Sequence, residues 1–170
     1  MLLSRHCIDE AATESLGTAI AQAMRQAGLP PLLLTLQGDL GAGKTTLVRS
    51  ILRALGVRGR IKSPSYALLE SYSIDGFGLE LKQSVGLTVY HIDLYRFSSP
   101  DEWLDAGLGE ALGGQALCLV EWPEHAAGLP PADLQLHIAP ADPGRMVTMR
   151  AGTAAGEGLI DTLRSAQADA

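Results

Sequence analysis

The sequence predicts an α/β fold: a layered sheet with parallel strands at its centre, antiparallel strands at its edges, and helices packed on it. One observation is the apolar run 32–37, which leads through a glycine-rich turn into a helical pattern at 44–55. A second is the mixing of strand-like and helix-like segments, which is typical of layered α/β sheets. The third is a pair of strand-like segments, 133–140 and 145–152, whose short connection predicts an antiparallel hairpin. We expect one domain over residues 1–170, because this length suits a single core.

The first half of the chain contains two helix patterns and two strand patterns. In order, we expect a helix at 9–28, a buried strand at 32–37, a helix at 44–55, a polar basic loop at 58–65, a strand at 66–74, and a hairpin tip or insertion at 75–86. Apolar residues recur at helical spacing in the first helix, and Gly28 marks its end. Gly56 ends the second helix in the same way. We assign no role to the segment 75–86.

The second half begins with a strand at 87–95, favoured by its β-branched and aromatic residues. A helix follows, in which Ser99 fits the N-cap, Pro100 the first helical position and Glu102 the capping box. We then expect a strand at 116–122, the antiparallel pair joined through Asp142-Pro143-Gly144, and a terminal helix at 156–166. The last few residues are expected to fray.

The composition indicates an ordered globular chain, with 46% apolar and 19% charged residues. No apolar run approaches the roughly 20 residues that cross a membrane, and residues 1–10 lack the apolar core of a signal peptide. We therefore expect a cytoplasmic protein without a membrane partner. Cys7 and Cys118 lie far apart and the four His show no ligand spacing, which argues against a disulfide scaffold or a zinc site. Cys118 is expected to be a buried apolar residue.

The charge is negative overall but unevenly distributed. The net charge of −6 argues against broad nucleic-acid binding by this chain alone. Residues 40–69 nevertheless contain no acid and six cations: Lys44, Arg49, Arg53, Arg58, Arg60 and Lys62. Arg49 and Arg53 are four residues apart and share one helix face. Two interpretations stay open: a docking surface for an acidic partner or tRNA, and a solvated helix face.

Residues 38–45, GDLGAGKT, match G-x-x-x-x-G-K-[ST], the P-loop pattern. The glycines let the chain bend so that successive backbone N–H groups point inward, and the helix N-terminus adds its positive dipole end. We expect Lys44 to contact the β- and γ-phosphates and the Thr45 hydroxyl to ligate Mg²⁺. The motif predicts a P-loop NTPase-like three-layer sandwich whose nucleotide site includes Asp39, Leu40, Gly41, Ala42, Gly43, Lys44, Thr45 and Thr46.

A P-loop also needs a carboxylate near the metal, at the end of a neighbouring strand. Asp93 ends the strand pattern LTVYHID and Glu121 ends ALCLVE, and spacing alone does not rank them. We expect one to hold Mg²⁺ through water and the other to orient the attacking water. The chain lacks the N/T-K-x-D segment with which GTPases read guanine, which favours adenine. Trp122 is expected to lie near the nucleotide or to serve in packing.

Four segments together resemble a known family. They are GDLGAGKTTLVRSILRALG (38–56), SPSYALLESY (63–72), VYHIDLYRF (89–97) and LVEWPE (119–124). Their order and rough spacing are similar to those of the TsaE family, small bacterial P-loop ATPases of tRNA threonylcarbamoyladenosine synthesis. The resemblance runs from the first helix, with Thr13 to Gly17, to about Glu124. Beyond that point only the general layout agrees.

The resemblance implies an activity and partners. Family members hydrolyse ATP with Mg²⁺ and work with TsaB and TsaD, and we predict slow ATP turnover by this chain alone and faster turnover with these partners. TsaD transfers the threonylcarbamoyl group to N6 of adenosine 37 in ANN-decoding tRNAs, and TsaE proteins support that turnover without performing the transfer. We therefore expect a partner-activated ATPase that meets tRNA only indirectly, through the TsaB–TsaD complex.

The resemblance also assigns residues. Gly41, Gly43, Lys44 and Thr45 would bind phosphates and metal. Glu121 resembles the Mg²⁺-associated carboxylate, and Asp93 resembles the acid near the γ-phosphate that hydrolysis requires; with Lys44 these two would form the catalytic set. The segment at Ser63–Ser65 resembles a switch-like loop that usually reads S-P-T-[FY]. Ser65 stands in the Thr position and keeps its hydroxyl for a metal or γ-phosphate contact.

Two alternatives share the same phosphate cradle. A small-molecule kinase needs an acceptor pocket and usually a mobile lid that carries several Arg residues. The cations after Lys62 are scattered, at Lys82, Arg96, Arg145, Arg150 and Arg164, and no insertion has the size of a lid. Release of phosphate to water would distinguish an ATPase from such a kinase. An ATP-dependent scaffold whose hydrolysis is incidental stays open as a further alternative.

Overall fold

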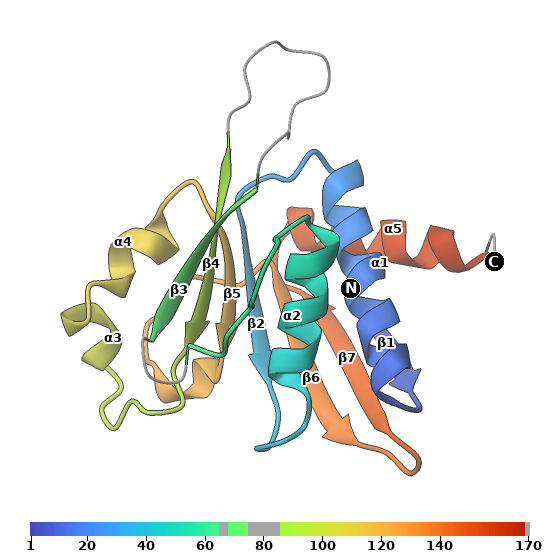
Figure 1. The fold of residues 1–170 in the computed structure, drawn as a ribbon, viewed down its shortest axis with the longest axis horizontal. Helices are drawn as coiled ribbons and strands as arrows, with labels where there is room; N and C mark the ends of the chain where they lie inside the picture. Colours follow the sequence, from blue (N-terminus) through green and yellow to red (C-terminus); the bar gives the residue numbers. More distant parts are fainter. Residues whose placement is uncertain (65–67, 75–85, 169–170) are drawn as a thin grey trace.

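A single mixed sheet carries the whole arrangement (Figure 1). The computed structural model describes residues 1–64, 68–74 and 86–168. Within them the strand order is β1-β7-β6-β2-β5-β4-β3. The central strands β6, β2, β5 and β4 are parallel, whereas β1, β7 and β3 pair antiparallel with their neighbours. The strands are β1 (Leu2–Cys7), β2 (Leu32–Gln37), β3 (Leu69–Ile74), β4 (Leu87–Asp93), β5 (Leu117–Glu121), β6 (Leu134–Pro140) and β7 (Arg145–Ala151).

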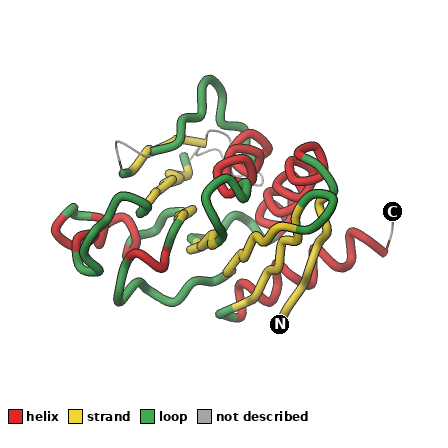
Figure 2. Tube along the Cα trace, turned by 90° about the horizontal axis from the view of Figure 1, so that it is seen from below, coloured by secondary structure: helices red, strands yellow, loops and turns green. Residues whose placement is uncertain are grey.

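Helices cover both faces of this sheet. They are α1 (Glu10–Gln26), α2 (Lys44–Ala54), α3 (Glu102–Asp105), α4 (Leu108–Gly113) and α5 (Ala154–Ala168), with a 3₁₀ turn η1 at Pro123–His125. Figure 2 looks nearly along α1 and α2 and shows them on one side of the strands, opposite the short helices α3 and α4. The terminal helix α5 packs against α1 and β7. The three-layer α/β prediction is therefore confirmed.

The burial of β2 explains why its sequence is apolar from Leu32 to Leu36, except at Thr35. Leu32, Leu34 and Leu36 belong to the core beneath α1 and α2, whereas Leu33 belongs to the core beneath α3 and α4. A strand that is covered on both faces has no solvent side on which to place polar residues. Apart from the buried Thr35, the polar positions therefore begin where β2 ends, at Gln37 and the glycine-rich loop.

Most of the expected elements are present, with three differences. The sequence pattern did not predict β1, which pairs with β7 at the edge of the sheet. The helix expected to begin after Ser99 starts at Glu102, with Asp101 at the N-cap, and Gly107 divides it into α3 and α4. The Glu102 carboxylate nevertheless accepts the backbone N–H groups of Ser98 and Ser99, as a capping-box acid would. The terminal helix is longer than expected, since it begins at Ala154.

Two expectations lie partly outside the described residues: the start of the strand at 66–74 and nearly all of the segment 75–86. The hairpin of β6 and β7 is confirmed, and its turn is closed by the Ala141 N–H, which donates to the Gly144 carbonyl over 3.0 Å. Over the described residues, none of the helices has the length and apolar character needed to cross a membrane.

Candidate nucleotide site

The P-loop bends between β2 and α2 on glycines that other residues would not replace easily. Gly43 stands at the N-cap of α2 with φ of +106°, and Gly38 has φ of +145°. A Cβ on Gly38 would lie 2.4 Å from the Ile138 carbonyl oxygen, so only glycine lets the loop run this close to β6. No side chain caps α2. Its first backbone N–H groups therefore stay available to an anion.

Lys44 is held inside the bend of this loop. Its side chain is buried, and Nζ donates to the carbonyl oxygens of Gly38 and Asp39. Nζ also lies 3.5 Å from the centroid of the Trp122 ring. Burial lowers the pKa of Lys44, and the negative charges of Glu121, Glu124, Asp93 and Asp39 oppose that shift. The Lys44 ammonium group thus lies among the backbone groups of the P-loop, where it could contact a bound phosphate.

Both predicted acids lie at the same end of the sheet. Because β4 and β5 are parallel neighbours, Asp93 is directly opposite Glu121 in the register. Both are buried, with 5% and 2% of their surface exposed. Thr45 Oγ1 donates to Glu121 Oε2 over 3.0 Å. Of the two acids, Glu121 is therefore the one hydrogen-bonded to the hydroxyl at the start of α2.

Asp93 has a different set of contacts. Its Oδ1 accepts the Tyr95 backbone N–H over 3.0 Å, and its Oδ2 accepts the Ser63 hydroxyl over 3.4 Å. Ser63 belongs to the loop between α2 and β3. This carboxylate therefore connects the end of β4 to the loop in which a switch was expected. Ser65, the other predicted residue of that loop, lies outside the described residues.

His91, for which no role was predicted, lies beside Glu121 in the structure. Nε2 lies 2.8 Å from Glu121 Oε1, and since a carboxylate accepts hydrogen bonds, the N–H of Nε2 is the donor. The ring is fully buried, and its Nδ1 has no hydrogen-bond partner among the described residues. A signal existed: His91 precedes Asp93 by two residues, and alternate residues of a strand share one face.

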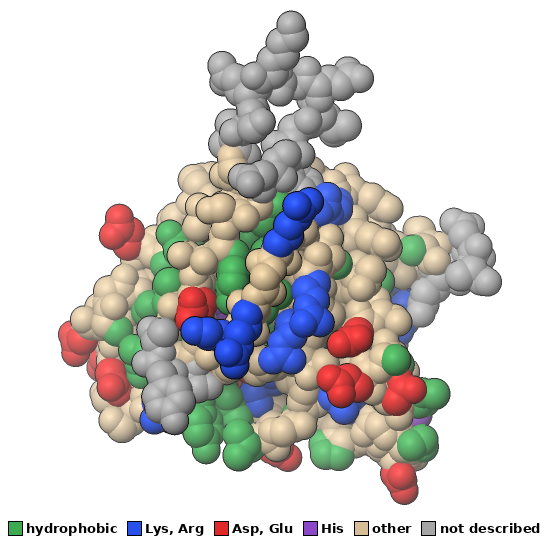
Figure 3. Space-filling model, viewed as in Figure 1, with side chains coloured by type: hydrophobic (Ala, Val, Ile, Leu, Met, Phe, Trp, Pro, Cys, Tyr) green, Lys and Arg blue, Asp and Glu red, His purple; other side chains and the backbone are tan. Residues whose placement is uncertain are grey.

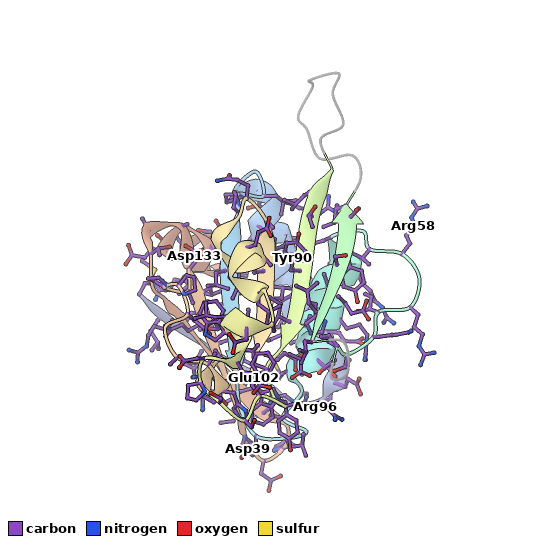
Figure 4. All side chains as sticks on the ribbon, turned by 90° about the vertical axis from the view of Figure 1, so that its left-hand side faces the viewer. Asp39, Arg58, Tyr90, Arg96, Glu102 and Asp133 are labelled. Carbon is purple, nitrogen blue, oxygen red and sulfur yellow. The ribbon has the colours of Figure 1, made fainter. Side chains whose placement is uncertain are left out.

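One pocket of about 250 Å³ joins these groups. The predicted residues that line it are Leu40, Gly41, Gly43, Lys44, Thr45, Thr46, Asp93, Glu121 and Trp122. Asp39 and Ala42 do not line the pocket. Arg145, for which no role was predicted, donates from Nη1 to the Ala42 carbonyl over 3.2 Å and so supports the P-loop. In Figure 4, Asp39 lies at one end of the molecule, on the loop that follows β2.

An aromatic group stands at the edge of the same pocket. The ring centroids of Trp122 and Tyr95 are 4.9 Å apart, and His125 lies 5.6 Å from Trp122. Trp122 also packs against the core beneath α3 and α4. Trp122 therefore packs against this core and also lines the pocket, and its contact with a nucleotide stays a prediction. Tyr95 was not predicted, although its place two residues after Asp93 was visible in the sequence.

The donor set fits Mg²⁺. The Thr45 hydroxyl and the Glu121 carboxylate are hard oxygen ligands, and a nucleotide-bound Mg²⁺ takes its other ligands from phosphate and water. The described part of the chain holds no group of three His, Cys, Asp or Glu side chains suited to a metal ion. Thr45 and Glu121 therefore provide two of the oxygen ligands that a nucleotide-bound Mg²⁺ would need.

Comparison with known proteins decides the family. The model of the family described as "Threonylcarbamoyl adenosine biosynthesis protein TsaE" matches residues 7–147. The chain belongs to the TsaE family. Among its TsaE relatives, the tRNA threonylcarbamoyladenosine biosynthesis protein TsaE of Haemophilus influenzae is 38% identical over 76% of this chain and 76% of its own length. The protein of that name from Rickettsia felis is 33% identical over 92% of this chain and 84% of its own.

A solved structure shares the fold of this chain. The crystal structure of YdiB from Bacillus subtilis superimposes with a TM-score of 0.73 and 29% identity. The match covers 98% of this chain and 97% of that one. The fold of this TsaE-family chain is therefore similar to that of a known protein over nearly its whole length.

Proposed function

We infer that this chain is an Mg²⁺-dependent ATPase that supports threonylcarbamoylation of adenosine in tRNA. The observation that carries the proposal is the pocket in which the P-loop, the Thr45–Glu121 contact and Asp93 meet. The names of the TsaE relatives supply the pathway, tRNA threonylcarbamoyladenosine biosynthesis. Adenine is favoured because the chain lacks a guanine-reading segment.

Each residue would then have a distinct role. The backbone N–H groups from Gly41 to Thr45 would bind the phosphates, with Lys44 moving from the loop carbonyls to the β- and γ-phosphates. Thr45 and Glu121 would hold Mg²⁺, which when bound neutralises charge on the phosphates. Asp93, oriented by the Tyr95 N–H, would position the attacking water and accept its proton.

The energy of hydrolysis would serve a partner complex. We expect the chain to act with TsaB and TsaD, to hydrolyse ATP slowly alone and faster with them, and to leave the carbamoyl transfer to TsaD. The contact between Ser63 and Asp93 supports a nucleotide-dependent loop, since a γ-phosphate beside Asp93 would reach the same loop.

The test measures phosphate release from ATP by the purified chain, alone and across a titration with TsaB–TsaD. We expect Asp93→Asn to lower the rate by roughly 100-fold, as loss of a positioned base does, while ATP affinity by calorimetry changes little. Lys44→Ala serves as the comparison, because it should lower ATP affinity itself.

Two results would contradict the proposal. One is a hydrolysis rate that stays constant over the whole titration. The other is full tRNA modification by the Asp93→Asn variant, which would make the chain an ATP-dependent scaffold. Transfer of the phosphoryl group to an acceptor in place of water would instead identify a kinase.

A further inference from the structure

A second hollow lies next to the nucleotide pocket and is lined by cations. It has a volume of about 490 Å³ and is formed by Arg49 and Arg53 of α2 with Arg60, Ile61, Lys62 and Ser63 of the following loop. We call it the basic groove. In Figure 3 its blue side chains gather on the face that shows α2 in Figure 1. The four-residue spacing of Arg49 and Arg53 places both on the helix side that faces the loop.

Ion pairs among the described residues do not account for these charges. The recorded ion pairs of the described residues involve other side chains, and none includes Arg49, Arg53, Arg60 or Lys62. Residues 40–69 contain no acid at all, in a chain whose net charge is −6. Four like charges around one hollow repel each other, so the cluster costs stability unless an anion binds there.

The basic groove is connected to the nucleotide pocket through one residue. Ser63 lines both hollows, and its hydroxyl donates to Asp93 Oδ2. Anything seated in the basic groove therefore touches the loop that contacts the acid proposed for hydrolysis. That position would let an occupant alter the loop, or sense it.

The size and setting of the basic groove favour a protein occupant. RNA carries regularly spaced phosphates over a long path, and the chain's net charge of −6 disfavours their binding beyond the groove. The described residues that line the groove include no aromatic side chain, so they provide no stacking platform for bases. A compact acidic patch on a protein needs only a local match of charge.

We propose that the basic groove is the docking surface for an acidic patch of the protein partner, and that docking there acts on the Ser63–Asp93 contact. The proposal rests on the proposed function, because it requires a partner complex. It adds the surface and the chemistry through which that complex binds.

The test uses the double variant Arg49→Glu/Arg53→Glu of the full chain, with TsaB–TsaD as the probe. Arg58→Glu is the matched control, since Arg58 belongs to the same basic run but does not line the basic groove and extends away from the body in Figure 4. We expect the double variant to bind the complex at least tenfold more weakly and with a smaller salt dependence. Arg58→Glu should change both little, and the ADP affinity of every isolated variant should match the wild type. The thermal midpoint of the isolated double variant should equal or exceed that of the wild type, because the charge reversal relieves the repulsion within the groove.

Each other outcome overturns the proposal in a recognisable way. Equal binding by the double variant and wild type excludes the basic groove but leaves the partnership intact. A wild-type chain that hydrolyses ATP and does not bind TsaB–TsaD refutes the partnership and the docking surface together. Labelled tRNA that binds the wild type and not the double variant, without TsaB–TsaD, assigns the basic groove to RNA. Loss of ADP affinity in the double variant makes the groove part of the nucleotide site.

Discussion

At the scale of single residues, Glu121 is fixed from two sides. His91 donates to Oε1 and Thr45 donates to Oε2, so the carboxylate cannot rotate without losing a buried hydrogen bond. A buried acceptor left unpaired costs about 1–3 kcal/mol. Because a bound metal would compete for the Thr45 hydroxyl, His91 would be the partner that keeps Glu121 oriented in the proposed metal complex.

This arrangement predicts a metal-specific defect for His91→Leu. Without the Nε2–H donor, Glu121 should present its carboxylate in several orientations. The Mg²⁺ concentration needed for half-maximal effect on ADP binding, measured by calorimetry, should rise about 10–100-fold. ADP affinity without Mg²⁺ should stay within about twofold, because the phosphate cradle is unchanged.

The matched variant His91→Gln keeps an N–H donor of similar reach. It should restore a large part of the Mg²⁺ response. If His91 served only in packing, His91→Leu would lower metal-free ADP affinity and the thermal midpoint as well, and Gln would restore neither.

At the scale of elements, local patterns were predictable and distant pairings were not. The strand–loop–helix from β2 to α2 is contiguous in the sequence, so its motif can be recognised from the sequence alone. The strand β1 pairs with β7, and its residues Leu3 and Cys7 face the core. Arg5 lies between them on the same face of the strand, and its Nη2 donates to the Leu163 carbonyl. The apolar alternation that signals a strand is therefore broken. Likewise, the contact of His91 with Glu121 depends on the register between β4 and β5, which cannot be derived from the sequence of either strand alone.

The packing of α1 on α2 gives an element-scale prediction at Gly17. A Cβ there would lie 1.7 Å from Ser50 Oγ and 3.1 Å from the Leu47 carbonyl oxygen. Helix propensity alone would make Gly17→Ala stabilising by about 1 kcal/mol. We expect the opposite sign, a loss of roughly 1–3 kcal/mol in the free energy of unfolding measured in urea, because the two helices must move apart.

Two further variants isolate the cause. Gly158→Ala in α5 is the control, since a Cβ there meets nothing within 4 Å, and it should stabilise the protein. In a double-mutant cycle, Ser50→Gly should recover much of the loss in Gly17→Ala by removing the clashing side chain. A stabilising Gly17→Ala would refute the close approach of α1 and α2.

At the scale of the whole molecule, the sheet separates two thiols by depth. Cys7 ends the edge strand β1, whereas Cys118 lies in β5 between β2 and β4, and its Sγ donates to the Ala111 carbonyl. Burial raises the pKa of both thiols, that of Cys118 to about 11. Only the thiolate reacts with alkylating or disulfide reagents. In the folded protein at pH 8, Cys118 should therefore be nearly inert, and its labelling should require opening of the central sheet.

Thiol labelling at pH 8 should then report two different openings. Separation of β1 exposes Cys7 alone, so Cys7, followed in the Cys118→Ala variant, should label faster than Cys118, followed in Cys7→Ala. ADP with Mg²⁺ should slow Cys118 labelling by about 1 + [L]/Kd, because β5 carries Glu121 and its opening destroys the pocket. Cys7 labelling should change little, since β1 lies four strands from β5 in the sheet order.

Equal protection of both thiols by ADP would mean that the sheet opens as a single unit. Equal rates in the folded protein would mean that Cys118 is not shielded as its position in β5 requires.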